Sequence, residues 1–152
     1  MTIREYYMNT FLNIRTTILR TALYTIPDDP IPWKRPGGSK IRYDTQKDLK
    51  LIVGLQMRQQ HSSQAIFEGP LHVDFIFHFP IPKKVKKPET WIGKFVTSTP
   101  DCSNLQKFYE DTANGILYLD DKQIVKGTFL KVYNIDVMTT IRIQELKQEQ
   151  YV

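Results

Sequence analysis

Alternation of apolar and polar residues marks residues 71–79, LHVDFIFHF, as the clearest strand in the chain. Every odd-numbered position from Leu71 to Phe79 is apolar, whereas His72 and His78 point to the opposite face. The apolar face is therefore expected to bury against helices. The two histidines lie six residues apart, and nothing nearby completes a metal-ligand set, so we interpret them as ordinary strand residues.

Helical spacing predicts a first helix that starts at Asp44 as its cap and runs to about Gln60. Its buried side is expected to carry Leu51, Ile52 and Leu55. Gly54 lies inside this segment and weakens the helical pattern.

A second helix is predicted over residues 103–114. Its buried stripe, at i, i+3 and i+4 spacing, contains Leu105, Phe108, Tyr109 and Thr112. Ser103 followed by Gln106 matches a capping box, and Asn114-Gly115 gives a C-terminal stop.

Three further strands are predicted, at residues 22–27, about 123–133 and 136–145, with a turn at Asn134 between the last two. The expected fold class is α+β: a small mixed sheet of about four strands packed against two main helices, with long basic loops. Residues 21–152 form this domain. Residues 1–20 are expected to be an N-terminal extension, either a loosely held segment or a short helix that carries Tyr7, Phe11, Ile14 and Ile18.

Composition changes this picture little. The chain has 152 residues, of which 41% are hydrophobic and 24% charged, as in one soluble globular domain with a sizeable core. No apolar run reaches the roughly 20 residues of a membrane helix, and the N-terminus has no secretory-signal pattern. The single cysteine, Cys102, excludes an intramolecular disulfide and suits a reducing interior, so we expect a cytoplasmic protein.

Charge is distributed in blocks along the chain. Two loops predicted between the regular elements are basic, and the residues of these loops that could contact phosphates are Lys34, Arg35, Lys40, Arg42, Lys83, Lys84, Lys86, Lys87 and Lys94. Residues 101–121 are acidic instead, with five acids and one lysine. Basic loops beside an acidic cluster suit a polyanion held near a cation site, although solvated loops with scattered surface acids explain the same pattern.

The candidate chemistry lies in residues 101–121. Asp101 precedes the second helix, Lys107 and Asp111 lie on its exposed face, and Asp120-Asp121 follows soon after it. If the chain returned the aspartate pair to the start of the helix, the converging carboxylates would need a divalent ion, and hard oxygen ligands select Mg²⁺ or Mn²⁺. A lysine beside them could stabilise charge on a phosphodiester. The simpler alternative is a loop aspartate pair and a local Lys107–Asp111 ion pair.

Four stretches resemble the RusA family of Holliday junction resolvases: IPDDPIPWKRP (26–36), YDTQKDLK (43–50), PDCSNLQKFYEDTANG (100–115) and YLDDKQIV (118–125). The family pattern Asp-x-Asp-Asn-Leu-x-Lys reads Asp101 to Lys107 here, and a later Asp-Asp followed by Gln and an aliphatic residue matches the segment that starts at Asp120. The likeness covers roughly residues 21–146 and leaves residues 1–20 outside.

The resemblance implies a RusA-like nuclease that works as a homodimer and cuts four-way DNA junctions by paired symmetric nicks, in bacteria or phage-infected cells. It further implies a Mg²⁺ cofactor, with Mn²⁺ as a substitute. The implied metal-binding acids are Asp101, Asp120 and Asp121, with Asp111 as a further ligand, and the implied catalytic lysine is Lys107. Trp33 and Trp91 could stack on an unpaired junction base or simply pack in the fold.

One position departs from the family pattern, because its second acid is Ser103 here. Serine caps a helix as well as aspartate does, but it supplies no negative charge to a metal. Asp111 or a water molecule could compensate. The alternative function is a non-catalytic or weakly active protein that binds junctions on the same scaffold.

Overall fold

A computed structural model describes residues 1–5, 16–38, 40–41 and 44–148. Four strands form one sheet in the order β1-β4-β2-β3. β4 pairs antiparallel with β1 and β2, whereas β2 and β3 are parallel, so the sheet is mixed. The strands are β1 (Thr16–Pro27), β2 (Leu71–Pro80), β3 (Ile124–Asn134) and β4 (Met138–Gln148). The predicted α+β class is confirmed.

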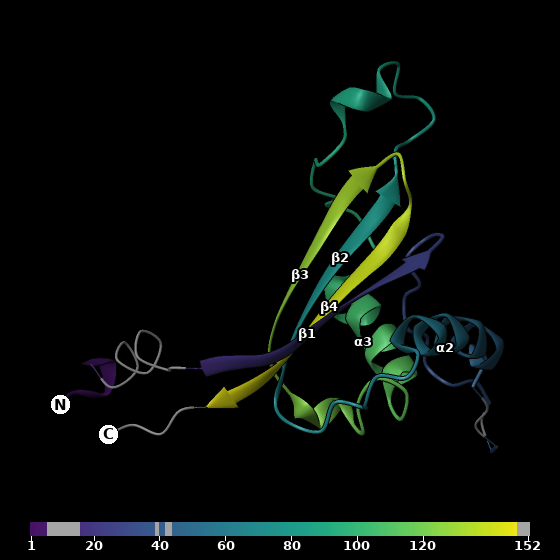
Figure 1. Cartoon of the computed structure of the whole chain (residues 1–152). Helices are drawn as coiled ribbons and strands as arrows, with labels where there is room; N and C mark the ends of the chain where they lie inside the picture. The colour runs from purple at the N-terminus through teal and green to yellow at the C-terminus, as the bar shows by residue number, and fades with distance from the viewer. Residues whose placement is uncertain (6–15, 39, 42–43, 149–152) are drawn as a thin grey trace.

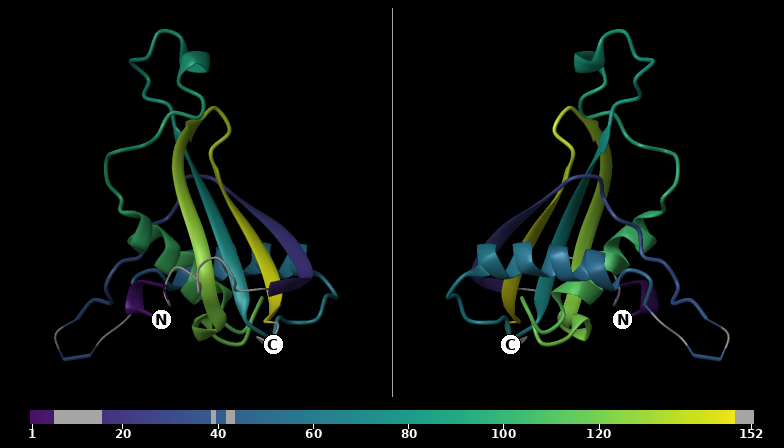
Figure 2. Two further views of the ribbon diagram at one scale, coloured as in Figure 1. Left: turned by 90° about the vertical axis from the view of Figure 1, so that its left-hand side faces the viewer. Right: turned by 90° about the vertical axis from the view of Figure 1, so that its right-hand side faces the viewer.

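Two α-helices, α2 (Lys47–His61) and α3 (Cys102–Ala113), lie on the same face of this sheet (Figure 1, Figure 2). Short 3₁₀ helices occur at Pro88–Thr90 (η1) and Asp121–Gln123 (η2). Within the described residues, no helix is long and apolar enough to cross a membrane.

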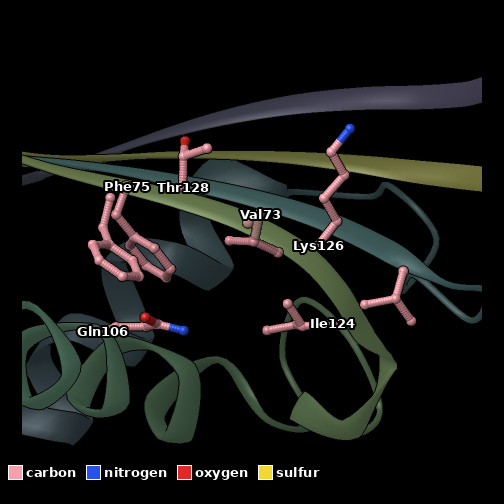
Figure 3. Close-up of a pocket in the computed structure, with 9 residues that line it drawn as sticks. Val73, Phe75, Gln106, Ile124, Lys126 and Thr128 are labelled. Atoms are coloured by element: carbon pink, nitrogen blue, oxygen red, sulfur yellow. The ribbon is translucent and has the colours of Figure 1, made fainter. Parts of the chain in front are cut away.

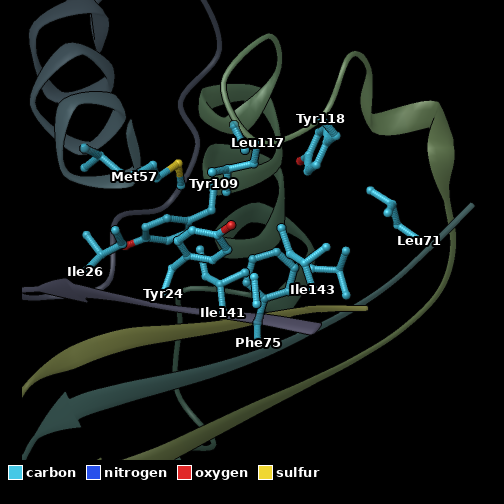
Figure 4. Packing of buried hydrophobic residues seen from close by; sticks show 14 of the residues in the cluster. Tyr24, Ile26, Met57, Leu71, Phe75, Tyr109, Leu117, Tyr118, Ile141 and Ile143 are labelled. Atoms are coloured by element: carbon cyan, nitrogen blue, oxygen red, sulfur yellow. The ribbon is translucent and has the colours of Figure 1, made fainter. Parts of the chain in front are cut away.

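The hydrophobic core lies between the sheet and the two helices (Figure 4). The predicted inner face of β2 is confirmed, since Leu71, Val73, Phe75 and Phe77 are all buried. The predicted stripe of α3 is also confirmed. The helix residues of the core are Val53, Met57, Leu105, Phe108, Tyr109 and Ala113, and β1 and β4 contribute Ala22, Tyr24, Ile26, Ile141 and Ile143.

The predicted buried side of α2 is wrong. Leu51, Ile52 and Leu55 are exposed, and the buried stripe instead contains Val53, Gly54 and Met57. A Cβ atom at position 54 would lie 3.0 Å from Cδ1 of Ile116, so the missing side chain lets the segment after α3 approach the helix closely. The glycine that weakened the helical pattern is thus part of the packing.

The first strand is longer than predicted. β1 begins at Thr16, within the segment expected to be an N-terminal extension. Ile18 lies in this strand and is about half exposed. Tyr7, Phe11 and Ile14 lie outside the described residues.

The two ends of the sheet carry different segments. Residues 81–100 leave the end of β2 and project well beyond the sheet (Figure 1). η2 lies at the opposite end, because it directly precedes Ile124, which pairs with Leu71 at the start of β2. This separation decides where the charged segments of the chain lie.

Candidate active site

Asp101 is the N-cap residue of α3, two positions earlier than the predicted cap Ser103. Its carbonyl oxygen accepts a hydrogen bond from the Leu105 amide at 3.1 Å, but its side chain makes no capping hydrogen bond. The predicted capping box is therefore wrong, and Gln106 donates to Glu110 at 2.6 Å instead. Asp101 and Ser103 are both exposed. The Asp101 carboxylate is thus available to a ligand at the start of the helix.

Lys107 stands one turn further along α3, and its ammonium lies over an aromatic ring. The Nζ atom is 3.7 Å from the centroid of the Trp33 ring. The structure records no ion pair between Lys107 and Asp111, although both are described, so the local pair considered above does not form. The lysine therefore carries its charge without a neutralising carboxylate.

Asp120 and Asp121 lie in a turn that Gln123 fixes. The Gln123 side-chain oxygen accepts hydrogen bonds from the backbone amides of Leu119 and Asp120, at 2.9 and 3.0 Å. Its amide nitrogen donates to the carbonyl oxygens of Phe67 and Gly69, at 3.0 and 3.1 Å. Asp120 accepts from the Lys122 amide at 2.9 Å, which completes a capping box at this turn.

Negative charge accumulates around this turn. The pKa of Asp121 is raised by burial and by its neighbours Asp120 and Asp111, while hydrogen bonding to the Lys122 amide lowers the pKa of Asp120. Burial, together with the nearby charges of Asp121 and Asp111, raises the pKa of Glu110. The raised pKa of Asp121 thus reflects burial together with repulsion between like charges that lie close to one another.

Glu110 is a member of this group that the sequence did not point to. Its neighbour Asp111 matched the family pattern, whereas Glu110 counted only as one acid among several. The sequence signal that could have pointed to Glu110 is its position directly after Tyr109, a residue of the predicted buried stripe. The Tyr118 hydroxyl donates to the backbone carbonyl of Glu110 at 2.9 Å, so the tertiary fold holds this part of α3 against the segment that leads into the turn.

The expected convergence of Asp101 with Asp120 and Asp121 does not occur within one chain. Asp111, in the last turn of α3, affects the pKa of Asp121, but Asp101 caps the other end of the helix. Ten residues of helix separate Asp101 from Asp111, which is about 15 Å. In the described part of the chain, no group of three or more metal-ligating side chains is arranged to hold an ion. The hairpin-like return that the prediction needed does not form, because β3 runs back along the length of α3 rather than to its start.

The residues present nevertheless fit part of a Mg²⁺ site. Mg²⁺ is usually bound through one or two carboxylates, with water and substrate phosphate as its remaining ligands. The pair Asp120 and Asp121 supplies two oxygen-donor side chains that repel each other in the absence of a cation. Asp101 supplies a third carboxylate at the other end of α3, free of capping hydrogen bonds.

The predicted phosphate-binding residues lie on two separate segments. Lys34 and Arg35 are exposed in the loop next to α3, and Lys40 is exposed further along that segment. Arg42 lies outside the described residues. The other predicted lysines, which are Lys83, Lys84, Lys86, Lys87 and Lys94, are exposed on the projecting segment 81–100, at the end of the sheet opposite to Asp120 and Asp121.

The projecting segment is tied to the sheet at its base. Gly93 and Val96 donate backbone hydrogen bonds to Tyr133 and Lys131 of β3. The Lys131 ammonium in turn donates to the carbonyl oxygens of Ser98 and Pro100, at 2.6 and 2.7 Å. The residue before Asp101 is therefore held against β3.

A groove of about 240 Å³ lies between α3 and β3, which the sequence did not predict (Figure 3). Gln106 of α3 faces Val73 and Phe75 across it, whereas Lys126 and Thr128 point away (Figure 3). Its lining mixes apolar side chains of β2 and β3 with polar ones, and it contains none of the acids assigned to the site.

The strand histidines contact polar residues of the sheet. Nε2 of His72 lies 2.8 Å from the Asp74 carboxylate, and Nδ1 of His78 lies 3.1 Å from the Asn134 amide. Neither histidine belongs to a group of metal-ligating side chains within the described residues.

Comparison with known proteins gives two matches. The chain matches a family described as "Endodeoxyribonuclease RusA" over residues 29–144. It is also similar to an uncharacterized protein, YqaN, of Bacillus subtilis (strain 168), with 29% identity over 136 residues, covering 81% of this chain and 95% of that protein. The family match spans Asp101, Lys107 and the Asp120-Asp121 turn.

Proposed function

Because the chain belongs to the RusA endodeoxyribonuclease family, we propose that it is a metal-dependent, structure-selective DNA endonuclease that resolves Holliday junctions. It would cut four-way DNA by paired symmetric nicks during recombination and repair. The observation that carries this proposal is the family match over residues 29–144, which contains all the acids and the lysine assigned to the site.

The residues have separate roles in the proposed reaction. Asp101, Asp120 and Asp121 hold Mg²⁺ or Mn²⁺, and Asp111 and Glu110 add negative charge next to the aspartate pair. When bound, the ion activates a water molecule and neutralises charge on the phosphodiester. Lys107 directs its ammonium to the scissile phosphate and stabilises the negative charge that develops there.

A homodimer suits this chemistry, since two equivalent sites match two equivalent strands of a four-way junction. β3 is an edge strand of the sheet, and its residues 125–130 are all exposed. In the described chain, the backbone of this stretch has no partner on its outer side, whereas the next residues pair with the base of the projecting segment. An exposed edge of this kind is a template for pairing with a second copy.

Pairing of two β3 strands would also complete the set of carboxylates. The Asp120-Asp121 turn precedes β3, and Lys131 near its other end holds the carbonyl of Pro100 next to Asp101. In an antiparallel, two-fold pair the start of one β3 lies near the end of the other. The aspartate pair of one copy would therefore approach Asp101 of the other.

The exposed lysines of the projecting segment and of the loop at Lys34 would contact DNA phosphates. A protein that contacts about 6–10 phosphates loses roughly 10³–10⁵ in affinity between 50 and 200 mM salt. A steep salt dependence of junction binding is therefore expected.

Two observations favour a second candidate function. Ser103 replaces an acid of the family pattern, and among the residues that the structure describes no three metal-ligating side chains of one chain come together. A protein that binds junctions but cuts them slowly or not at all is consistent with both facts.

The test is a cleavage assay on synthetic four-way DNA with and without Mg²⁺, beside linear duplex of the same sequence. Paired nicks that need Mg²⁺ and disappear in Asp121→Asn would support the nuclease. Asp136→Asn is the matched control, because Asp136 is an exposed acid in the turn between β3 and β4. Tight junction binding without cutting would support the second candidate, and equal affinity for linear and branched DNA would contradict both.

A further inference from the structure

The contact between Trp33 and Lys107 joins two segments that lie 74 positions apart in the sequence. The indole ring is half-buried against the core, whereas the lysine is exposed. With the Nζ atom 3.7 Å from the ring centroid, the ammonium lies within the roughly 6 Å at which an aromatic face attracts a cation.

The loop that carries Trp33 is held at four successive residues, by three partners. The Ile31 amide donates to the hydroxyl of the buried Tyr109 at 2.9 Å, and the Trp33 amide donates to the Asn104 carbonyl at 2.8 Å. The third contact is made by the buried side chain of Gln46, which accepts from the Lys34 amide at 2.8 Å and donates to the Pro32 carbonyl at 2.9 Å.

These contacts tie the ring to the helix that bears its partner. Asn104 belongs to α3 and precedes Lys107 by three residues, or about one helical turn. The indole therefore cannot shift along α3 without breaking backbone hydrogen bonds on both sides of it. The ring that faces Lys107 is therefore held in a fixed place relative to α3.

A lysine that acts on a phosphate needs a fixed position and an intact charge. Its long side chain loses much rotamer freedom when it is ordered, so a free lysine is a poor electrostatic catalyst. A carboxylate partner would order it but would also neutralise it. An aromatic face attracts the ammonium without adding a net negative charge and leaves the N–H groups on the other side free to donate.

We propose that Trp33 is a positioning residue for Lys107, holding its ammonium over the indole face so that it meets the scissile phosphate fully charged. The inference rests on the proposed function of Lys107 in phosphodiester cleavage. It also assigns this face of Trp33 to the lysine, so that a junction base cannot stack on it at the same time.

Single-turnover cleavage of a four-way junction tests the proposal, with junction affinity measured separately. Trp33→Leu should lower the cleavage rate about tenfold, with junction affinity nearly unchanged, while Trp33→Phe retains an aromatic face and should keep most of the rate. Trp91→Leu is the comparison variant, because Trp91 lies 5.0 Å from the Lys94 ammonium on the projecting segment: any loss that it causes should appear in junction affinity and not in the single-turnover rate at saturating protein.

A double-mutant cycle separates positioning from a general structural role. Lys107→Ala should remove most of the cleavage, and adding Trp33→Leu to it should cause no further loss, because the ring acts only through the lysine. An equal further loss in the Lys107→Ala background would overturn the proposal. So would a Trp33→Leu variant that loses junction affinity but keeps its rate, which would indicate base stacking instead.

A measurement without DNA separates this inference from the proposed function. The rate at which an amine-reactive reagent modifies Lys107, followed by mass spectrometry, should rise several-fold in Trp33→Leu and little in Trp33→Phe. If the parent chain cuts no junction, the nuclease proposal fails by itself. An unchanged reactivity of Lys107 in Trp33→Leu would overturn the positioning inference whether or not the chain cuts DNA.

Discussion

Asp101 and Asp121 lie at opposite ends of α3. Asp101 caps the first turn of the helix, whereas Asp121 shares its electrostatic surroundings with Asp111 in the last turn. The helix between them spans about 15 Å, so the two carboxylates of one chain do not meet on one ion. For the proposed nuclease, we therefore expect a second subunit to complete the site.

Mixed dimers test whether the two acids act across subunits. Asp101→Asn and Asp121→Asn should each be inactive alone. Co-expressed chains with different tags should form heterodimers in which one site carries both substitutions and the other carries neither. Random assembly then leaves about a quarter of all sites intact.

The expected product of these heterodimers is a junction nicked in one strand, because each dimer keeps one working site. Purification through both tags isolates them, and a denaturing gel counts the nicks. If both acids acted within the same chain, every site would carry one substitution, and the purified heterodimer would stay inactive.

Restoring the acid at position 103 should strengthen the metal site. Ser103 is exposed in the first turn of α3, near the Asp101 carboxylate, so Ser103→Asp adds a charged oxygen ligand without disturbing the core. We expect roughly a tenfold lower Mg²⁺ concentration for half-maximal cleavage.

Asn104→Asp is the control for that substitution. It adds the same charge to the same helical turn and gains the same favourable interaction with the helix N-terminus. If both variants lower the required Mg²⁺ concentration equally, the change comes from the added charge at the helix N-terminus rather than from a new metal ligand. If Ser103→Asp is less active than the parent chain, the serine is not a missing ligand.

Stability should decrease below neutral pH because of His61. Burial lowers the pKa of this histidine, whose Nδ1 lies 2.6 Å from the Tyr24 hydroxyl and whose Nε2 lies 3.2 Å from the Ala65 carbonyl. The unfolded chain therefore binds the proton more readily. The stabilising contribution is complete above the unfolded pKa, near 6.5, and is lost as the pH falls through the folded pKa.

Denaturant unfolding at several values between pH 5 and 8 measures this dependence. His61→Gln should make the unfolding free energy depend less on pH. Some pH dependence should remain, because burial also lowers the pKa of His78. Tyr24→Phe should cost about 1–3 kcal/mol at neutral pH, because it leaves a buried ring nitrogen without its partner. Burial raises the pKa of Tyr24 to about 12, so its hydroxyl stays protonated throughout this range. A parent chain with a flat profile would contradict the assignment.

Gly127 should not tolerate a side chain. A Cβ atom at this position of β3 would lie 2.6 Å from the backbone carbonyl oxygen of Val73 in the neighbouring strand β2. Since a backbone oxygen cannot move aside without disturbing the parallel pairing, Gly127→Ala should cost about 1–3 kcal/mol of unfolding free energy.

Gly69→Ala is the matched control for Gly127→Ala. Its nearest contact would be 3.5 Å, to the flexible side chain of Glu145, so the change should stay within about 0.5 kcal/mol. Thermal unfolding of the two variants beside the parent chain checks both values. Equal stability of the two variants would show that β3 adjusts to the added methyl group.

Local sequence determined the regular elements of this protein. Strict alternation from Leu71 to Phe79 fixed the strand and its inner face, because side chains of a strand point to its two faces in turn. The spacing of Leu105, Phe108 and Tyr109 fixed α3 and its buried stripe in the same way. The pattern in residues 100–125 identified the family, since it depends on residue types at short spacing.

The tertiary structure decided everything that depends on contacts between distant segments. Periodicity could not say which side of α2 faces the core. The leucines of this helix are exposed and Gly54 is buried, because the segment after α3 packs against the side of the helix that carries Gly54. The same holds for Lys107, whose partner is Trp33 from another loop rather than Asp111 from its own helix. The direction in which β3 returns along α3 also decided that Asp101 and Asp121 stay apart within one chain. A residue's neighbours in sequence determine its backbone conformation and the face of the helix or strand on which it lies. Only the packing of whole elements determines which charged side chains lie close together.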